Sequence, residues 1–160
     1  QSVLALPLSN GQTAHIRFDT GVPLYGRNLI VKSDLKLGHL DRDHGYPVPS
    51  TGSDFYSDNY IATDGATVFT LSSPDYAFKG SDNHTLVMYD SDKNYLGWQH
   101  IASATQTLSK SNVAYIRLSI NFVDEGGVSG KLSDWLDHHR YKLEKGSLAT
   151  PYSPAPEDVM

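Results

Sequence analysis

The stretch VAYIRLSINF at residues 113–122 carries the clearest structural signal in the chain. From Ala114 onward every second side chain is apolar, and the intervening side chains are polar or amphipathic. Successive side chains of a strand point to opposite faces of a sheet, so this pattern predicts a strand with one face on the core and one face in water. The apolar positions are Ala114, Ile116, Leu118, Ile120 and Phe122, and the others are Tyr115, Arg117, Ser119 and Asn121.

Further short strands are predicted on both sides of this stretch. The turn Asn10-Gly11 predicts a β-hairpin over residues 3–18, because Asn-Gly is the strongest short-range hairpin signal. A second hairpin is predicted over residues 85–101, and only residues 132–140 have a helical pattern. Many short strands separated by Gly, Asn and Asp turns are typical of an all-β fold, and we expect a jelly-roll β-sandwich of two antiparallel sheets.

The sequence divides into three parts. Residues 1–26 are expected to form an N-terminal hairpin and connector, and residues 27–149 to form the jelly-roll module. Residues 150–160 are interpreted as a linker, because their prolines favour an extended polyproline backbone.

The composition narrows the class of ligand. The chain has 13 Lys and Arg against 18 Asp and Glu, which gives a net charge of −5 at pH 7 with neutral histidine. A nucleic-acid-binding domain needs a basic surface to neutralise phosphates, so we expect no nucleic-acid partner and favour a neutral ligand. The absence of cysteine excludes disulfides and thiolate metal sites. No run of 18 apolar residues occurs, so we expect no membrane span.

The predicted wet face of the strand at 113–122 is the first candidate ligand site. Sugar rings stack their apolar C–H faces on aromatic side chains, while fixed polar groups meet their hydroxyl edges. Tyr115 is a candidate for stacking, and Arg117 and Asn121 are candidates for hydrogen bonds to hydroxyls. The alternative interpretation is an ordinary solvated sheet face.

Other aromatic residues are further candidates. Residues 33–59 are predicted to form a long ordered binding loop, which carries Tyr46 and Tyr56. Trp98 and Trp135 are the only tryptophans. For Trp98 a place in the core is the alternative to a binding platform, whereas the polar neighbours of Trp135 indicate a surface position.

Metal binding and catalysis have weak signals. Asp90, Asp92 and Asn94 resemble the start of a calcium-binding EF-hand loop, but Tyr95 stands where that loop needs glycine. Turns are the favoured interpretation here and at residues 41–45. Structural calcium stays open, and no other cofactor is expected. The G-x-S-x-G motif is absent and no pair of carboxylates stands out, so we expect a non-catalytic protein.

Several segments resemble a module that is common in tail and baseplate proteins of bacteriophages infecting Gram-positive bacteria. The most specific is the closing segment YKLEKGSLATPYSPAPED at residues 141–158. The resemblance implies a galactose-binding-like jelly roll that attaches to host cell-wall polysaccharide, often of a lactic acid bacterium, and it carries no fixed set of ligand residues. The other matching segments are residues 27–30, 38–45, 60–67, 87–95 and 114–119.

We therefore expect a non-catalytic carbohydrate-binding module of a phage tail protein, located extracellularly at the tail tip of the virion. The expected partners are a bacterial surface saccharide and other tail or baseplate chains, without nucleic acid or membrane. A structural or oligomerisation module of the tail fibre or baseplate is the main alternative. A cell-wall hydrolase is a third hypothesis.

Overall fold

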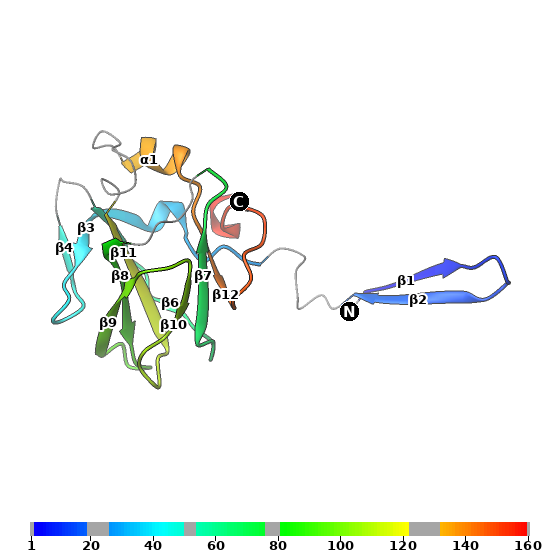
Figure 1. The fold of residues 1–160 in the computed structure, drawn as a ribbon, viewed down its shortest axis with the longest axis horizontal. Helices are drawn as coiled ribbons and strands as arrows, with labels where there is room; N and C mark the ends of the chain where they lie inside the picture. The colour runs from blue at the N-terminus through cyan, green and yellow to red at the C-terminus, as the bar shows by residue number, and fades with distance from the viewer. Residues whose placement is uncertain (1, 19–25, 50–53, 76–80, 122–131, 160) are drawn as a thin grey trace.

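Antiparallel sheets make up most of the structure, which is a computed structural model describing residues 2–18, 26–49, 54–75, 81–121 and 132–159. The larger sheet has seven strands, and its strand order is β4-β3-β5-β11-β8-β9, with β6 also paired to β11 (Figure 1). Its strands are β3 (Leu35–Leu40), β4 (Pro47–Pro49), β5 (Asp54–Ser57), β6 (Ile61–Ala62), β8 (Ser81–Tyr89), β9 (Tyr95–Ile101) and β11 (Tyr115–Asn121).

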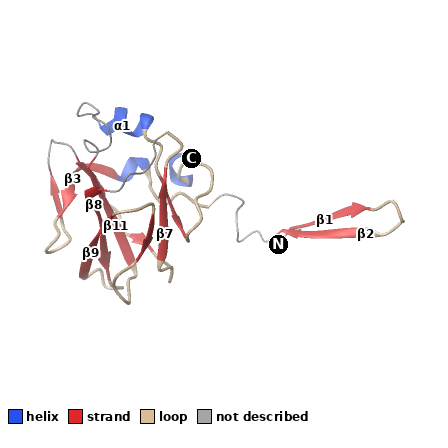
Figure 2. Ribbon diagram, viewed as in Figure 1, coloured by secondary structure: helices blue, strands red, loops and turns tan. Residues whose placement is uncertain are grey.

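A three-stranded sheet packs against the larger one. Its order is β10-β7-β12, formed by β7 (Val68–Ser72), β10 (Thr105–Thr107) and β12 (Lys142–Lys145). Alternate side chains of the two sheets meet in one buried cluster, which includes Phe69 and Leu71 from β7 with Ile116, Leu118 and Ile120 from β11. All pairings between the described strands are antiparallel, which confirms the predicted all-β sandwich (Figure 2).

The helical prediction is confirmed by α1 (Leu132–His138). Leu132 and Leu136, four residues apart, lie on one face of the helix and pack against the main core cluster. Two short 3-10 helices, η1 (Lys32–Asp34) and η2 (Pro156–Asp158), flank the sandwich strands in sequence. Within the described residues, no helix is long and apolar enough to cross a bilayer.

The outer face of the seven-stranded sheet is also buried over much of its area, which corrects the prediction of a wet face on β11. A second buried cluster on that face contains Leu40, Tyr56, Val87 and Tyr89, with Tyr60, Tyr95, Trp98 and Tyr115 packed around it. Alternation along β11 is therefore real, but its second face is covered by aromatic side chains around Tyr115 and Arg117. The polar and amphipathic positions were misread because a buried aromatic layer and a solvated face have the same period in sequence.

The segment predicted as a long loop at residues 33–59 contains three strands. Leu35 and Leu37 of β3 pair with Ser57 and Phe55 of β5, and the resulting ladder adds β3 to the large sheet. Polar residues dominate the segment, but its apolar residues Leu35, Leu40 and Phe55 are buried by the pairing. The second prediction for this region, that residues 41–45 form a turn, is confirmed as the connection from β3 to β4.

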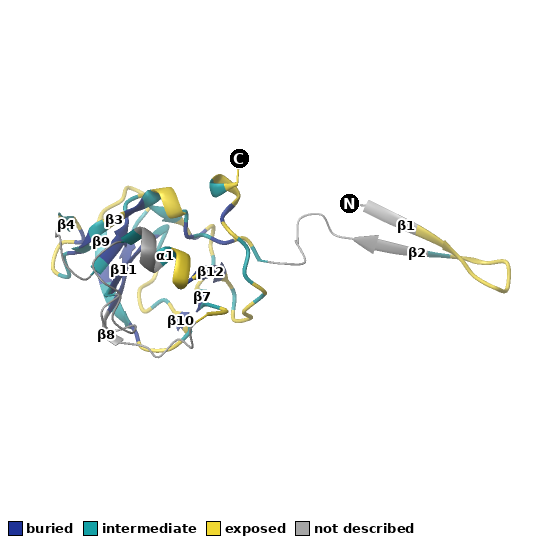
Figure 3. Cartoon of the chain, turned by 90° about the horizontal axis from the view of Figure 1, so that it is seen from above, coloured by how far each residue is buried: buried dark blue, intermediate teal, exposed yellow. Residues whose placement is uncertain are grey.

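The N-terminal hairpin is confirmed and forms a sheet of its own. Strands β1 (Ser2–Pro7) and β2 (Thr13–Phe18) pair antiparallel around the predicted Asn10-Gly11 turn, in which the Leu8 carbonyl accepts the Gly11 N–H at 3.1 Å. Gly11 has a φ of +80°, which favours glycine because it has no Cβ. The hairpin lies apart from the sandwich, and its tip is exposed (Figures 1 and 3).

The proline-rich end of the chain packs on the sandwich, in contrast to the free linker that its composition suggested. Lys142 and Glu144 on β12 are buried, and both contact Thr150. The Lys142 ammonium donates to Thr150 Oγ1 at 2.9 Å and to the Pro151 carbonyl at 2.8 Å, while Glu144 accepts the Thr150 N–H at 3.0 Å. A buried ion pair needs such additional hydrogen bonds, so the closing segment completes the fold.

Farther along, the same segment contacts the start of the sandwich. Ala155 is fully buried, and the Asp158 carboxylate accepts the backbone N–H of Lys32 at 2.7 Å and that of Ser33 at 3.3 Å. Residues 150–159 thus contact both an early segment of the sandwich, at residues 32–33, and its last strand, β12. The boundaries proposed for the three parts otherwise stay predictions.

Replacing Thr150 with valine tests this role, because the change keeps the shape and removes the hydroxyl. We expect the free energy of unfolding to fall by about 1–3 kcal/mol, since buried Lys142 and Glu144 each lose a hydrogen-bond partner. Urea denaturation followed by Trp fluorescence measures the change. Thr67→Val, at an exposed position, is the matched control. Equal stability of both variants and the wild-type chain would contradict a structural role for the closing segment.

Candidate functional site

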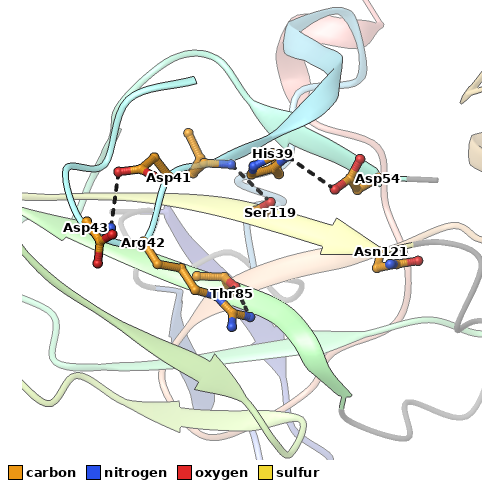
Figure 4. A pocket seen from close by; sticks show the side chains of 9 residues that line it. His39, Asp41, Arg42, Asp43, Asp54, Thr85, Ser119 and Asn121 are labelled. Carbon is orange, nitrogen blue, oxygen red and sulfur yellow. Dashed lines mark hydrogen bonds and ion pairs between the residues drawn. The ribbon is translucent and has the colours of Figure 1, made fainter. Parts of the chain in front are cut away.

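A polar cleft of about 380 Å³ opens on the outer face of the seven-stranded sheet, beside the turn that connects β3 to β4 (Figure 4). The pairing register of the strands brings the residues at the base of the cleft together. Ser119 of β11 pairs with Thr85 of β8, and Asn121 of β11 pairs with Asp54 of β5, so these four side chains share a face. The complete lining is His39, Leu40, Asp41, Arg42, Asp43, Asp54, Thr85, Ser119 and Asn121.

Two buried hydroxyl groups form the floor of the cleft. Thr85 and Ser119 are only 3% and 4% exposed. Ser119 Oγ accepts the Leu40 N–H at 3.3 Å, and Thr85 Oγ1 accepts from the Arg42 guanidinium at 3.1 Å. A hydroxyl group can donate one hydrogen bond and accept two. Within the described residues, no protein acceptor is found for either hydroxyl proton.

One wall of the cleft is the Asp41–Tyr46 turn, which presents Arg42 and two carboxylates. The Arg42 guanidinium lies over the Trp98 ring, 4.3 Å from its centroid, and also reaches Thr85. Asp41 accepts hydrogen bonds from the backbone N–H groups of Asp43 and His44 at 3.1 and 2.7 Å. These bonds order the turn, and they leave the Asp43 carboxylate exposed at the rim.

The protonation of Asp41 is set by its partners. Partial burial by itself would raise the pKa of this carboxyl, but hydrogen bonds from the side chain and backbone of His44 outweigh that effect and lower its pKa below the ordinary 3.8. Asp41 is therefore a stable anion at neutral pH. A general acid needs a raised pKa, so Asp41 is unsuited to that role.

The opposite wall combines His39 with Asp54. The His39 Nδ1 lies 3.6 Å from an Asp54 carboxylate oxygen. Asn121 lies near this end of the cleft (Figure 4), and its backbone N–H donates to His84 Nδ1 at 3.3 Å. The cleft thus offers donors on its floor and both donors and acceptors on its walls, which is the pattern that a polyhydroxylated ligand requires.

The predicted ligand residues do not gather in one place. Asn121 lines the cleft, and the Trp98 ring contacts the guanidinium of Arg42, which also lines it. Tyr46, 55% exposed, stands on the same turn and stacks on His44 with 5.4 Å between ring centroids. These three residues are therefore near the cleft, although only Asn121 lines it.

The other candidates lie elsewhere. Tyr56 is buried in the outer aromatic cluster, so it is not placed to stack on a ligand. Tyr115 belongs to the same cluster and borders a separate depression between loop tips, which includes Asp64 and Asn112. Trp135 belongs to α1, but its side chain is outside the described part of the structure.

Arg117 is a structural residue, which corrects its place on a wet face. Its side chain is 4% exposed, and its guanidinium donates to the carbonyl groups of Ser57 at 3.2 Å and Asp58 at 2.8 Å. The guanidinium also lies over Tyr60, 4.5 Å from the ring centroid. These contacts neutralise the Arg117 guanidinium inside the protein, where it is not accessible to a ligand.

Most cleft residues were not identified from the sequence. Residues 41–45 were predicted as a turn, with structural calcium left open, and residues 38–45 belonged to the family resemblance. Nothing in the local pattern of Asp54, Thr85 or Ser119 distinguishes them from ordinary strand residues. Strand pairing across more than 30 residues of sequence brings them together. The alternation at residues 113–122 places Ser119 and Asn121 on one face of their strand, and it was the available sequence signal for the floor of the cleft.

The two turns predicted at residues 41–45 and 90–94 are held by hydrogen bonds to their own aspartates. In the described part of the chain, no group of three or more His, Asp or Glu side chains is placed to hold an ion. At residues 90–94 the Asp90 carboxylate accepts the N–H groups of Asp92 and Asn94 at 2.9 and 2.8 Å, as in an ordinary hairpin turn.

Comparison with protein-family models, curated proteins and solved structures gave no match.

Replacing Arg117 with alanine distinguishes a structural residue from a ligand residue. We expect the free energy of unfolding to fall by about 2–4 kcal/mol, because the carbonyl groups of Ser57 and Asp58 lose their charged donor inside the protein. Urea denaturation measures the loss. Arg140→Ala, which removes an exposed partner of Asp75, serves as control and is expected to have a much smaller effect. Unchanged stability with lost ligand binding would contradict this assignment.

Proposed function

We propose that the chain is a non-catalytic carbohydrate-binding module of a phage tail protein, and that it attaches the tail to cell-wall polysaccharide of a Gram-positive host. The observation that carries the binding part is the floor of the cleft, where two buried hydroxyls, for which no acceptor is found among the described residues, lie beside charged and amide groups. Sugars bring many hydroxyl acceptors and donors, so they match this lining better than an apolar ligand does.

Charge supports a neutral sugar. Three carboxylates, of Asp41, Asp43 and Asp54, line the cleft against one arginine, and the Arg42 guanidinium is already in contact with Thr85 and Trp98. The net charge of the chain is also negative. Anionic polymers are repelled by such a surface, whereas neutral saccharides are not.

The phage-tail part of the proposal comes from the closing segment at residues 141–158, which resembles tail and baseplate modules. The expected location is the virion tail tip, with other tail or baseplate chains as partners. A single cleft of this size binds a sugar weakly, and multiple copies on a tail would supply avidity.

Thr85→Val tests the cleft as the binding site. A fluorescently tagged chain is incubated with cells from a panel of Gram-positive strains, and free sugars and purified wall polysaccharide serve as competitors. We expect strain-restricted labelling by the wild-type chain, and binding about five- to tenfold weaker for Thr85→Val, because one hydroxyl contact and the Arg42 acceptor are lost.

Thr107→Val on β10 is the control, because Thr107 is exposed on the other sheet. It should label cells like the wild-type chain. Absence of labelling on every strain by folded wild-type protein would overturn the carbohydrate-binding proposal, and equal labelling by all three proteins would place the site outside this cleft.

A second candidate function, a structural or oligomerisation module, is favoured by the N-terminal hairpin. The β1–β2 register pairs Leu6 with Ala14 on one face of a two-stranded sheet. Leu6 is 40% exposed, and isolated hairpins are only marginally stable in water. Association with the hairpins of other copies would cover this face.

Sedimentation velocity of the whole chain and of a chain lacking residues 1–25 tests this second candidate. If the hairpins associate, the whole chain forms an oligomer and the shortened chain is a monomer at the same concentration. Leu6→Ser in the whole chain should shift the oligomer toward monomer, whereas Gln12→Ser at the exposed turn should not. A monomeric whole chain at the highest soluble concentration would contradict this function.

A further inference from the structure

The turn that forms one wall of the cleft is held by three aromatic residues from the β8–β9 hairpin. The Tyr95 hydroxyl donates to the Arg42 carbonyl, and the Tyr89 hydroxyl donates to the Gly45 carbonyl. The third residue, Trp98, lies under the Arg42 guanidinium. None of the three lines the cleft.

Inside the turn, the backbone closes on itself. The Asp41 N–H donates to the Tyr46 carbonyl at 2.9 Å, and the Gly45 N–H donates to the Asp41 carbonyl at 2.8 Å. Gly45 has a φ of +76°, and a Cβ there would lie 2.6 Å from the Tyr95 ring and 3.1 Å from the Tyr89 ring. The two rings therefore pack directly on the backbone of the turn, and glycine is required at this contact.

We infer that Tyr95 and Tyr89 are positioning residues, which hold the Asp41–Tyr46 turn in the shape that places Arg42 and the Asp43 carboxylate at the cleft. The inference rests on the proposed function, because it assigns a role in ligand binding to residues that do not touch the ligand. A turn that is already ordered loses little conformational entropy when a ligand binds, so its support contributes to affinity.

The carboxylates of the same wall affect the pKa of Tyr95. Burial is the main reason that the pKa of the Tyr95 phenol is raised above 10.0, and the negative charges of Asp43 and Asp41 raise it further. Replacing Asp43 with asparagine should lower the pKa of Tyr95, because a phenolate is then less strongly repelled. The phenol is thus a reporter of the turn's geometry.

Tyr95→Phe is the variant that tests the inference. It removes only the hydroxyl that donates to Arg42, whereas Tyr89→Phe would also remove a partner of Arg117. Amide hydrogen exchange in the absence of ligand should become several-fold faster at residues 41–46, and binding of the competing sugar found in the cell assay should weaken about three- to tenfold. The melting temperature should change little, since the core packing is kept.

Tyr115→Phe is the matched control, because Tyr115 lies in the same aromatic cluster and no hydroxyl hydrogen bond is found for it among the described residues. It should leave both exchange and binding unchanged. The ¹³Cζ resonance of Tyr95, followed over pH in the wild-type chain and in Asp43→Asn, checks that the phenol and the Asp43 carboxylate lie close together in solution.

Unchanged exchange at residues 41–46 in Tyr95→Phe would overturn the positioning role. Faster exchange with wild-type affinity would also overturn it, because the turn would then not limit binding. If the wild-type chain binds no saccharide, the proposed function fails, and the exchange data still decide whether the phenol holds the turn.

Discussion

The outer half of the sandwich depends on the contacts of one buried guanidinium, that of Arg117 in the middle of the central strand β11. Arg117 on β11 donates to the carbonyl groups of Ser57 and Asp58, and it faces the rings of Tyr60 and Tyr89. A buried charge must be hydrogen-bonded, and the end of β5 and the residues after it supply the acceptors. The aromatic cover on this face therefore forms around a fixed cation.

The outer face changes character along β11, and the cleft lies where the aromatic cover ends. Around Tyr115 and Arg117 the face is packed with tyrosines, whereas at Ser119 and Asn121 it is lined by hydroxyl, amide and carboxylate groups. One strand thus contributes to a second core at one end and to a polar cleft at the other. The rigid cluster also supplies the phenols that hold the Asp41–Tyr46 turn.

The chain ends add a second constraint. Lys142 and Glu144 are buried on β12 only because Thr150 and Pro151 supply hydrogen-bond partners from the closing segment. Sequence identified this segment as unusual, but proline content led to a linker interpretation. Prolines preset an extended backbone, and that backbone can either remain in solvent or pack along a sheet; the buried partners decide between the two.

The sequence by itself determined the β-rich class, the N-terminal hairpin at Asn10-Gly11, the hairpin turn at residues 90–94, the helix after residue 131 and the alternation of β11. These features depend on neighbours in the chain, since turn chemistry and side-chain period are local. Only tertiary structure decided that Arg117 and Tyr56 are internal and that His39, Asp54, Thr85 and Ser119 form one cleft. Strand register brings together residues that are distant in sequence, and a layer packed over a sheet face leaves no clear local mark, because aromatic and polar side chains occur on covered as well as on solvated faces.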